Sequence, residues 1–195
     1  MSTVDLIGST RLVADVVRGT DDAQLDAPTP CEDMPVRLML AHLHGLAIAF
    51  RDAALKINGP TTNTAPDPSR LVLPANWREL IPARLEELAA AWQETGAWAG
   101  TTAAGGLTMP AEDAGLVALD EVVLHGWDLA VATGQGYEPE QEALDAVEAF
   151  CAGIPDDPDA RNGLFGPRVA VGEGAGQFER VLGLAGRDPR WRPET

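Results

Sequence analysis

Apolar residues recur along this chain at the three- and four-residue spacing of amphipathic helices, and alternating strand-like patterns are scarce. The spacing predicts five helices and a short final helix, over residues 3–18, 35–56, 76–94, 111–133, 139–152 and 176–185. Asp33 and Pro35 form a start signal for the second helix, and Gly134 is a typical stop for the fourth. Pro82 predicts either a kink or a later start in the third helix.

Segments rich in glycine, proline and small polar residues separate these helices, and we expect loops over residues 57–75, 96–110 and 153–176. Four main helices joined by such loops predict an all-α, up-down four-helix bundle with extra C-terminal helices. We expect a single domain over residues 1–195, with the bundle in about 1–152 and a C-terminal extension in 153–195.

The charge balance of the chain excludes some partners. Thirty acidic residues against 14 basic ones give a net charge of −16, which repels nucleic acid and anionic membranes. No apolar run is long enough to span a membrane, and the N-terminus lacks the pattern of a secretory signal, so we expect a cytoplasmic protein. Cys31 and Cys151 form no metal-type pair and should be reduced thiols there. A homodimer is compatible with the sequence.

The fourth predicted helix carries three ionisable residues inside an otherwise apolar surface. Glu121, His125 and Asp128 stand at positions i, i+4 and i+7, so they share one face of the helix. One interpretation is a Glu–His pair on the solvent side, because that spacing alone is common. The narrowness of the polar stripe favours a buried site instead, since a solvent face normally carries more charge.

The second predicted helix contributes two histidines on different faces. His44 lies in line with Arg37 and Arg51 and is expected at the surface or its boundary, whereas His42 lies on an apolar line. His42 is therefore either a hydrogen-bonded core residue or a partner of the fourth helix.

Imidazole and carboxylate together suit divalent zinc, nickel or iron, and three protein ligands leave one coordination position open. The chain lacks the spacings of a closed zinc site, of di-iron bundles and of H-E-x-x-H proteases.

Three segments carry a resemblance to a known family. "TPCEDMPVRLMLAHLHG" and "DEVVLHGWDLAVATGQ" resemble signature segments of the mycothiol-dependent maleylpyruvate isomerase-like proteins, which belong to the DinB-like superfamily of metal-binding four-helix bundles. "LFGPRVAVGEGAGQFERVLGLAGRDPRW" resembles the tail of a short actinobacterial branch of that group. The resemblance implies a divalent ion, usually zinc, bound by His42, Glu121 and His125. Asp128 could orient a ligand or could be a charge on the helix surface.

The resemblance also implies a chemistry. In the isomerase-like interpretation the thiolate of mycothiol adds to a carbon–carbon double bond, and rotation and elimination give the trans product. Transfer of the thiol to another small electrophile, hydrolysis by a metal-bound water, and metal binding without catalysis are the alternatives. The isomerase itself carries a second, C-terminal domain, for which residues 153–195 are too few.

The substrate end of such a site is poorly marked in the sequence. Arg37, Arg51 and Arg168 could each bind a carboxylate. Cys31 is either a nucleophile, an extra metal ligand or a small buried hydrophobe. The tryptophans at positions 98 and 127 either line a cavity or belong to the core. A bundle whose histidines and glutamate are merely buried polar groups is the structural alternative.

Overall fold

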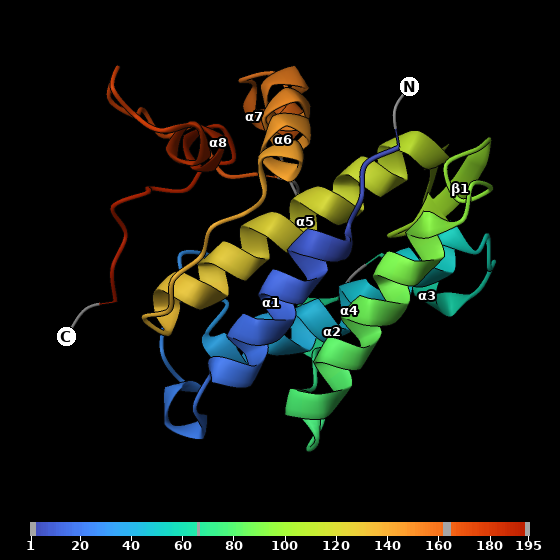
Figure 1. Cartoon of the computed structure of the whole chain (residues 1–195), viewed down its shortest axis with the longest axis horizontal. Coiled ribbons are helices and arrows are strands. Elements are labelled where there is room, and N and C mark those ends of the chain that lie inside the picture. The colour runs from blue at the N-terminus through green and yellow to red at the C-terminus, as the bar shows by residue number, and fades with distance from the viewer. Residues whose placement is uncertain (1–2, 66, 162–164, 194–195) are drawn as a thin grey trace.

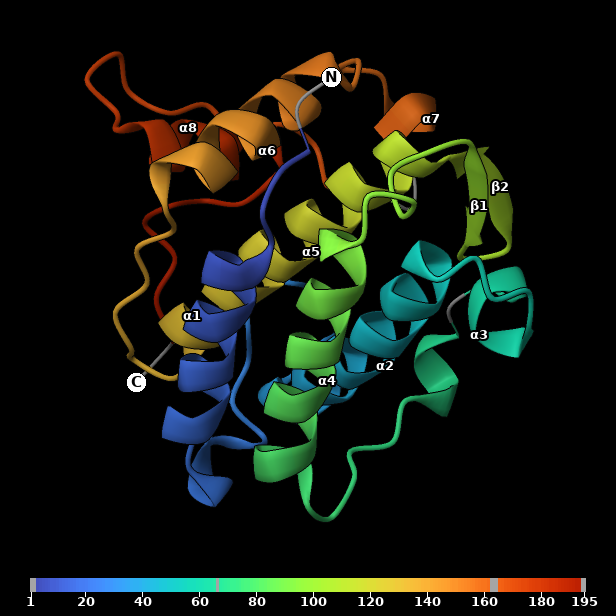
Figure 2. The ribbon, with the colours of Figure 1, turned by 45° about the vertical axis from the view of Figure 1, so that its right-hand side comes forward.

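Four long helices form a bundle, as the apolar spacing predicts (Figure 1). They are α1 (Ile7–Gly19), α2 (Val36–Ala54), α4 (Trp77–Gln93) and α5 (Ala111–Ala132). In this computed structural model, which describes residues 3–65, 67–161 and 165–193, α1 and α2 each pack against both α4 and α5. Figure 2 shows α4 between α1 and α2, with α5 behind them. The predicted all-α bundle fold is confirmed.

Helix α5 is the central element of the bundle, because 16 of its 22 residues are buried. An all-round apolar helix must be covered on every side, and α1, α2 and α6 (Gln141–Gly153) pack against it. It ends where the sequence predicts. Gly134 adopts a φ of 71°, and the Gln135 amide donates to the Ala130 carbonyl at 2.8 Å, which closes the last turn.

The first helix starts later than predicted, and the third starts where its apolar spacing predicts and not at Pro82. Helix α1 begins at Ile7 rather than at residue 3, and the Ile7 amide, which has no partner within the helix, donates to the Asp5 carboxylate at 2.8 Å. Helix α4 is continuous from Trp77 through the buried Pro82, so a later start at Pro82 is wrong.

The segment expected as a loop at residues 96–110 contains a β-hairpin, so that prediction is wrong. Strands β1 (Thr101–Ala104) and β2 (Leu107–Pro110) pair antiparallel around Gly105 and Gly106, whose φ angles are 57° and 83°. Two residues with positive φ form the tight turn that matches strand twist, so the Gly-Gly pair was the signal for a hairpin. The Thr102 hydroxyl donates to the Ala53 carbonyl at 2.6 Å and attaches the hairpin to α2.

Short helices interrupt the other two expected loops, with α3 at Pro60–Asn63 and α7 at Pro158–Arg161. Helix α8 (Gln177–Leu184) packs against α6, and α6 to α8 lie to one side of the bundle (Figures 1 and 2). Within the described part of the chain, no helix is long and apolar enough to cross a membrane.

Candidate metal centre

Helices α2 and α5 bring together the three residues that the sequence singles out as metal ligands. The Glu121 carboxylate is 3.1 Å from His42 Nε2 and 3.3 Å from His125 Nε2, both distances measured to Oε2. The two imidazole rings meet edge to face, with centroids 4.7 Å apart. One donor atom from each residue lies within 4.8 Å of the other two. Donors from two helices therefore converge on one point.

The position of these residues excludes the solvent-side interpretation of the Glu–His pair. His125 is buried, at 8% exposure, and Glu121 and His42 are partly buried, with side chains 28% and 21% exposed. The site thus opens toward solvent on the side of Glu121 and His42. His44, two residues after His42, is half-buried, and burial next to Arg84 lowers its pKa.

Two buried residues form polar contacts on the Nδ1 side of the His125 ring, away from Glu121. His125 Nδ1 is 2.9 Å from Asp128 Oδ2, and the same oxygen accepts from the Arg187 guanidinium at 3.1 Å. The Asp128 side chain is fully buried and that of Arg187 is 10% exposed. A hydrogen bond at Nδ1 leaves Nε2 of His125 directed at the cluster, which is the arrangement of a metal-binding histidine. Asp128 therefore lies where an orienting group would lie, and it is no surface charge.

Sequence patterns did not single out Arg187, which follows α8 and Gly186. Its guanidinium reaches Asp128 across 59 residues of sequence, and an isolated arginine in a loop carries no sign of its partner. The local structure that presents it is tight: Gly186 has a φ of 79°, and the Arg187 amide donates to the Leu182 carbonyl at 2.8 Å.

The charges of the cluster shift the pKa values of its members. Burial raises the pKa of Glu121, but hydrogen bonds with His125 and His42 outweigh it and bring that pKa well below its usual range. Burial lowers the pKa of His125, yet contacts with Asp128 and Glu121 raise it to about 9. The pKa of Asp128 is lowered because the nearby Arg187 charge outweighs its burial. In the metal-free protein, these contacts favour the protonated form of His125, which lies between the carboxylates of Glu121 and Asp128.

The arginines proposed for a substrate carboxylate are engaged elsewhere. Arg51 binds Asp52 and Glu87, both at 2.6 Å, and Arg37 is 3.4 Å from Asp26. Arg168 donates to the Ile154 carbonyl at 2.7 Å. Trp98 and Trp127 both belong to the buried core, and Trp127 also lines a pocket of about 320 Å³. The Trp98 ring lies so close to Gly115 on α5 that no side chain would fit there.

Cys31 approaches the site from the turn that precedes α2. Its sulfur, a ring nitrogen of His125 and a carboxylate oxygen of Asp128 lie within 4.8 Å of one another. The thiol is half-buried, and burial together with the Asp128 charge raises its pKa. The structure therefore brings the one cysteine of the α2 segment next to the predicted ligands.

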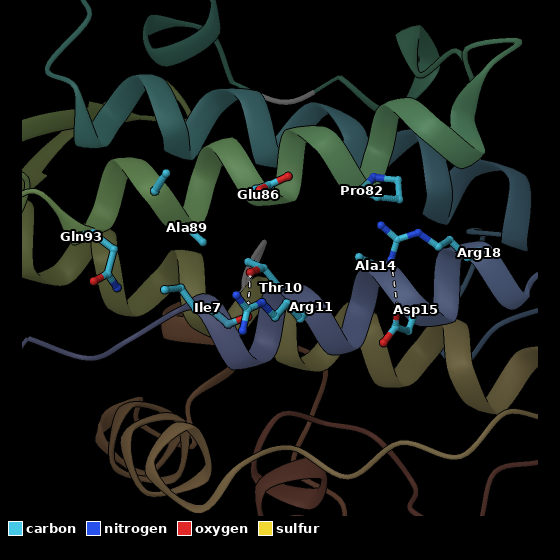
Figure 3. Close-up of a pocket in the computed structure, with 11 residues that line it drawn as sticks. Ile7, Thr10, Arg11, Ala14, Asp15, Arg18, Pro82, Glu86, Ala89 and Gln93 are labelled. Atoms are coloured by element: carbon cyan, nitrogen blue, oxygen red, sulfur yellow. Dashed lines mark hydrogen bonds and ion pairs between the residues drawn. The ribbon is translucent and has the colours of Figure 1, made fainter.

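A separate cavity of about 580 Å³ lies between α1 and α4 (Figure 3). Arg11, Arg18 and Glu86 line it, but Arg18 is already paired with the exposed Asp15, and no predicted ligand reaches it. The polar groups in this cavity form no convergent set, so size alone does not make it the better candidate site.

The chain is similar to one known protein family and to two solved structures. The family model described as the mycothiol maleylpyruvate isomerase N-terminal domain matches residues 8–130, which is more than half of the chain. The crystal structure of the mycothiol-dependent maleylpyruvate isomerase is similar at a TM-score of 0.58 and 19% identity. The crystal structure of a histidine-to-alanine mutant of that enzyme is similar at a TM-score of 0.56 and 17% sequence identity. Each match covers 75% of this chain and 66% of the isomerase chain, and at such identities the likeness concerns the fold. No curated protein sequence matches the chain.

Proposed function

Because the chain belongs to the family of the mycothiol maleylpyruvate isomerase N-terminal domain, we propose that His42, Glu121 and His125 bind a divalent metal ion. The convergence of their donor atoms within 4.8 Å carries this proposal. Two imidazoles and one carboxylate suit zinc, with nickel and iron as alternatives, and they leave a coordination position for an external ligand.

We propose further that the protein is a mycothiol-dependent isomerase or S-transferase acting on a small electrophile. The isomerase of similar fold is mycothiol-dependent, and the site here has an exposed side formed by His42 and Glu121. A divalent ion bound there would lower the pKa of a ligated thiol and so supply a thiolate at neutral pH.

The remaining residues of the site orient its ligands. Asp128 accepts the Nδ1 proton of His125 and so keeps Nε2 free for coordination. Arg187 balances the buried charge of Asp128. Because Arg187 belongs to the segment after residue 152, we also propose that residues 153–195 form an extension of the same domain as the bundle.

Metal analysis of protein purified without added metal tests the site. We expect close to one ion per chain in the wild type, and loss of that ion in His42→Ala and in His125→Ala. His44→Ala is the matched control, because this histidine lies on the same helix but belongs to neither group of convergent ligand atoms among the described residues. A wild-type protein without a bound ion, or equal retention in all three variants, would contradict the proposal.

Turnover of a panel of small electrophiles, with and without mycothiol, tests the chemistry. We expect product only with the thiol and none in His42→Ala. Thiol-independent hydrolysis that requires the ion would identify a metal-dependent hydrolase instead. A protein that binds the ion but turns over none of the panel would be a non-catalytic metal-binding bundle.

A further inference from the structure

A second group of metal-ligand atoms overlaps the first. It consists of Cys31, His125 and Asp128, whose donor atoms lie within 4.8 Å of one another, and it shares His125 with the group that contains His42 and Glu121. A sulfur donor therefore stands beside a proposed metal site that has only nitrogen and oxygen ligands.

This second group does not hold an ion of its own. Arg187 approaches both carboxylate oxygens of Asp128, at 3.1 and 3.5 Å, and its buried guanidinium already supplies the positive charge at that point. His125 Nδ1 is also occupied by its contact with Asp128. A cation placed there would face a buried cation of the protein, so the sulfur is the donor of this group that stays available.

The backbone around Cys31 is held in place while its sulfur is not. The Cys31 amide donates to the Thr29 hydroxyl at 3.2 Å, and that hydroxyl donates to the Met34 carbonyl at 2.7 Å. Among the residues that the structure describes, the thiol donates one hydrogen bond, to the Met34 sulfur at 3.7 Å, which is a weak acceptor. Rotation about the side-chain bond can therefore move the sulfur without breaking a backbone hydrogen bond.

We propose that Cys31 is a fourth protein ligand of the ion bound by His42, Glu121 and His125, and that an external thiol displaces it. This inference rests on the metal site of the proposed function. Zinc and cobalt favour four ligands and accept thiolate readily. A divalent ion with one carboxylate keeps one positive charge, which a thiolate neutralises.

The exchange is balanced in protons. When the sulfur–metal bond forms, the Cys31 thiol releases its proton to solvent. When an external thiol takes the position, that thiol releases its proton and Cys31 regains one. The cysteine thus covers the reactive position until a thiol cosubstrate arrives.

Cobalt substitution tests the ligand directly, because thiolate bound to Co²⁺ gives a near-ultraviolet charge-transfer band that nitrogen and oxygen ligands do not give. We expect the band in the wild type, its loss in Cys31→Ser and Cys31→Ala, and its retention in Cys151→Ala. Cys151 is the matched control, since its thiol is fully buried and donates a hydrogen bond to Asp120, which is not one of the proposed metal ligands. The two Cys31 variants should also bind cobalt more weakly. Removing a residue that only hydrogen-bonds to a metal ligand typically lowers metal affinity roughly 10–100-fold, and loss of a ligand should lower it by at least as much.

The outcomes separate this inference from the metal site itself. Cobalt bound at one per chain without the band, or a band that persists in both Cys31 variants, would overturn the role of Cys31 alone. A wild type that binds no cobalt would overturn the metal site with it. Mercaptoethanol should restore a thiolate band in Cys31→Ser at a lower concentration than it needs to change the wild-type spectrum; equal concentrations would contradict displacement.

Discussion

Asp120 and Glu121 are neighbours on α5, yet they end in opposite electrostatic states. Glu121 faces α2, and contacts with His125 of its own helix and with His42 of α2 bring its pKa below the usual range. Asp120 faces α6, where its polar contact is the thiol of Cys151 at 3.3 Å, and burial together with the Glu121 charge raises its pKa to about 7. Asp120 is buried and Glu121 is partly buried, but among the described residues Glu121 is the one of the two with imidazole nitrogens at hydrogen-bond distance.

The difference shows what makes a buried carboxyl suitable as a ligand. Burial alone favours the protonated form, which cannot bind a metal ion well. Imidazoles at hydrogen-bond distance keep Glu121 ionised and mark the position that a cation would take. Asp120 therefore serves as an internal reference for every test of Glu121.

The largest effect on stability is expected from removing the buried ion pair between Arg187 and Asp128. Arg187→Met leaves a buried carboxylate beside His125 without its arginine, and we expect a loss of about 3–5 kcal/mol in the free energy of unfolding. Arg190→Met is the control, because its pair with Asp188 is exposed, and it should change stability by less than about 0.5 kcal/mol. Denaturant unfolding of both variants measures this; equal losses would mean that burial of the pair is unimportant.

The second prediction sets the two neighbouring carboxyls against each other in metal binding. Glu121→Gln removes a proposed ligand, so the affinity of this variant for zinc should fall strongly. The loss should exceed the roughly 10–100-fold that is typical when a residue that only hydrogen-bonds to a metal ligand is removed. Asp120→Asn replaces a carboxyl that faces α6 and should retain wild-type affinity. Competition with a chromophoric chelator measures the zinc affinity of both variants. A lower zinc affinity in Asp120→Asn would contradict the conclusion that the α6-facing carboxyl is independent of the metal site.

The third prediction concerns pH in the metal-free protein. Folding raises the pKa of Asp120 from 3.8 to about 7 and that of His125 from 6.5 to about 9, so the folded state binds both protons more tightly. The unfolding free energy should therefore fall as pH rises from about 4 to 9, with each group contributing at most about 1.4 kcal/mol per pH unit. Glu121 and Asp128 act oppositely, because their lowered pKa values remove stability only in more acidic solution.

The Asp120→Asn variant divides this pH range between the two groups. Its unfolding free energy should be flatter between about pH 4 and 7 and should keep the wild-type decline at higher pH. Thermal unfolding in chelator across the pH range measures the profile. A profile identical to that of the wild type would mean that Asp120 keeps an ordinary pKa in the fold.

The smallest effect is expected from Cys151→Ala. The substitution removes the thiol that donates to Asp120 and leaves a small void in a fully buried position, so it should cost about 1 kcal/mol of stability. Zinc affinity should not change, because the thiol lies on the α6 side. A loss of affinity would show that the two faces of α5 are coupled.

Much of the fold could be predicted from periodicity. The spacing of Val36, Leu40 and Leu43 specifies the apolar face of α2, and Gly134 ends α5 because few other residues adopt its backbone conformation readily. The hairpin at residues 101–110 was missed, since four-residue strands carry almost no periodic signal and only the Gly-Gly turn indicated it. At the start of α1, the Ile7 amide donates a hydrogen bond to the Asp5 carboxylate, which the spacing of apolar residues does not indicate.

By itself, the sequence determined which residues of α5 share a face, because helical geometry sets the relation of Glu121, His125 and Asp128 without reference to the rest of the chain. It also separated His42 from His44 by the same argument. Only the tertiary structure decided that His42 lies 3.1 Å from Glu121, that Arg187 neutralises Asp128, and that Cys31 stands beside His125. Those contacts join residues 59 to 94 positions apart, and local spacing carries no information about which surfaces the packing of helices brings together.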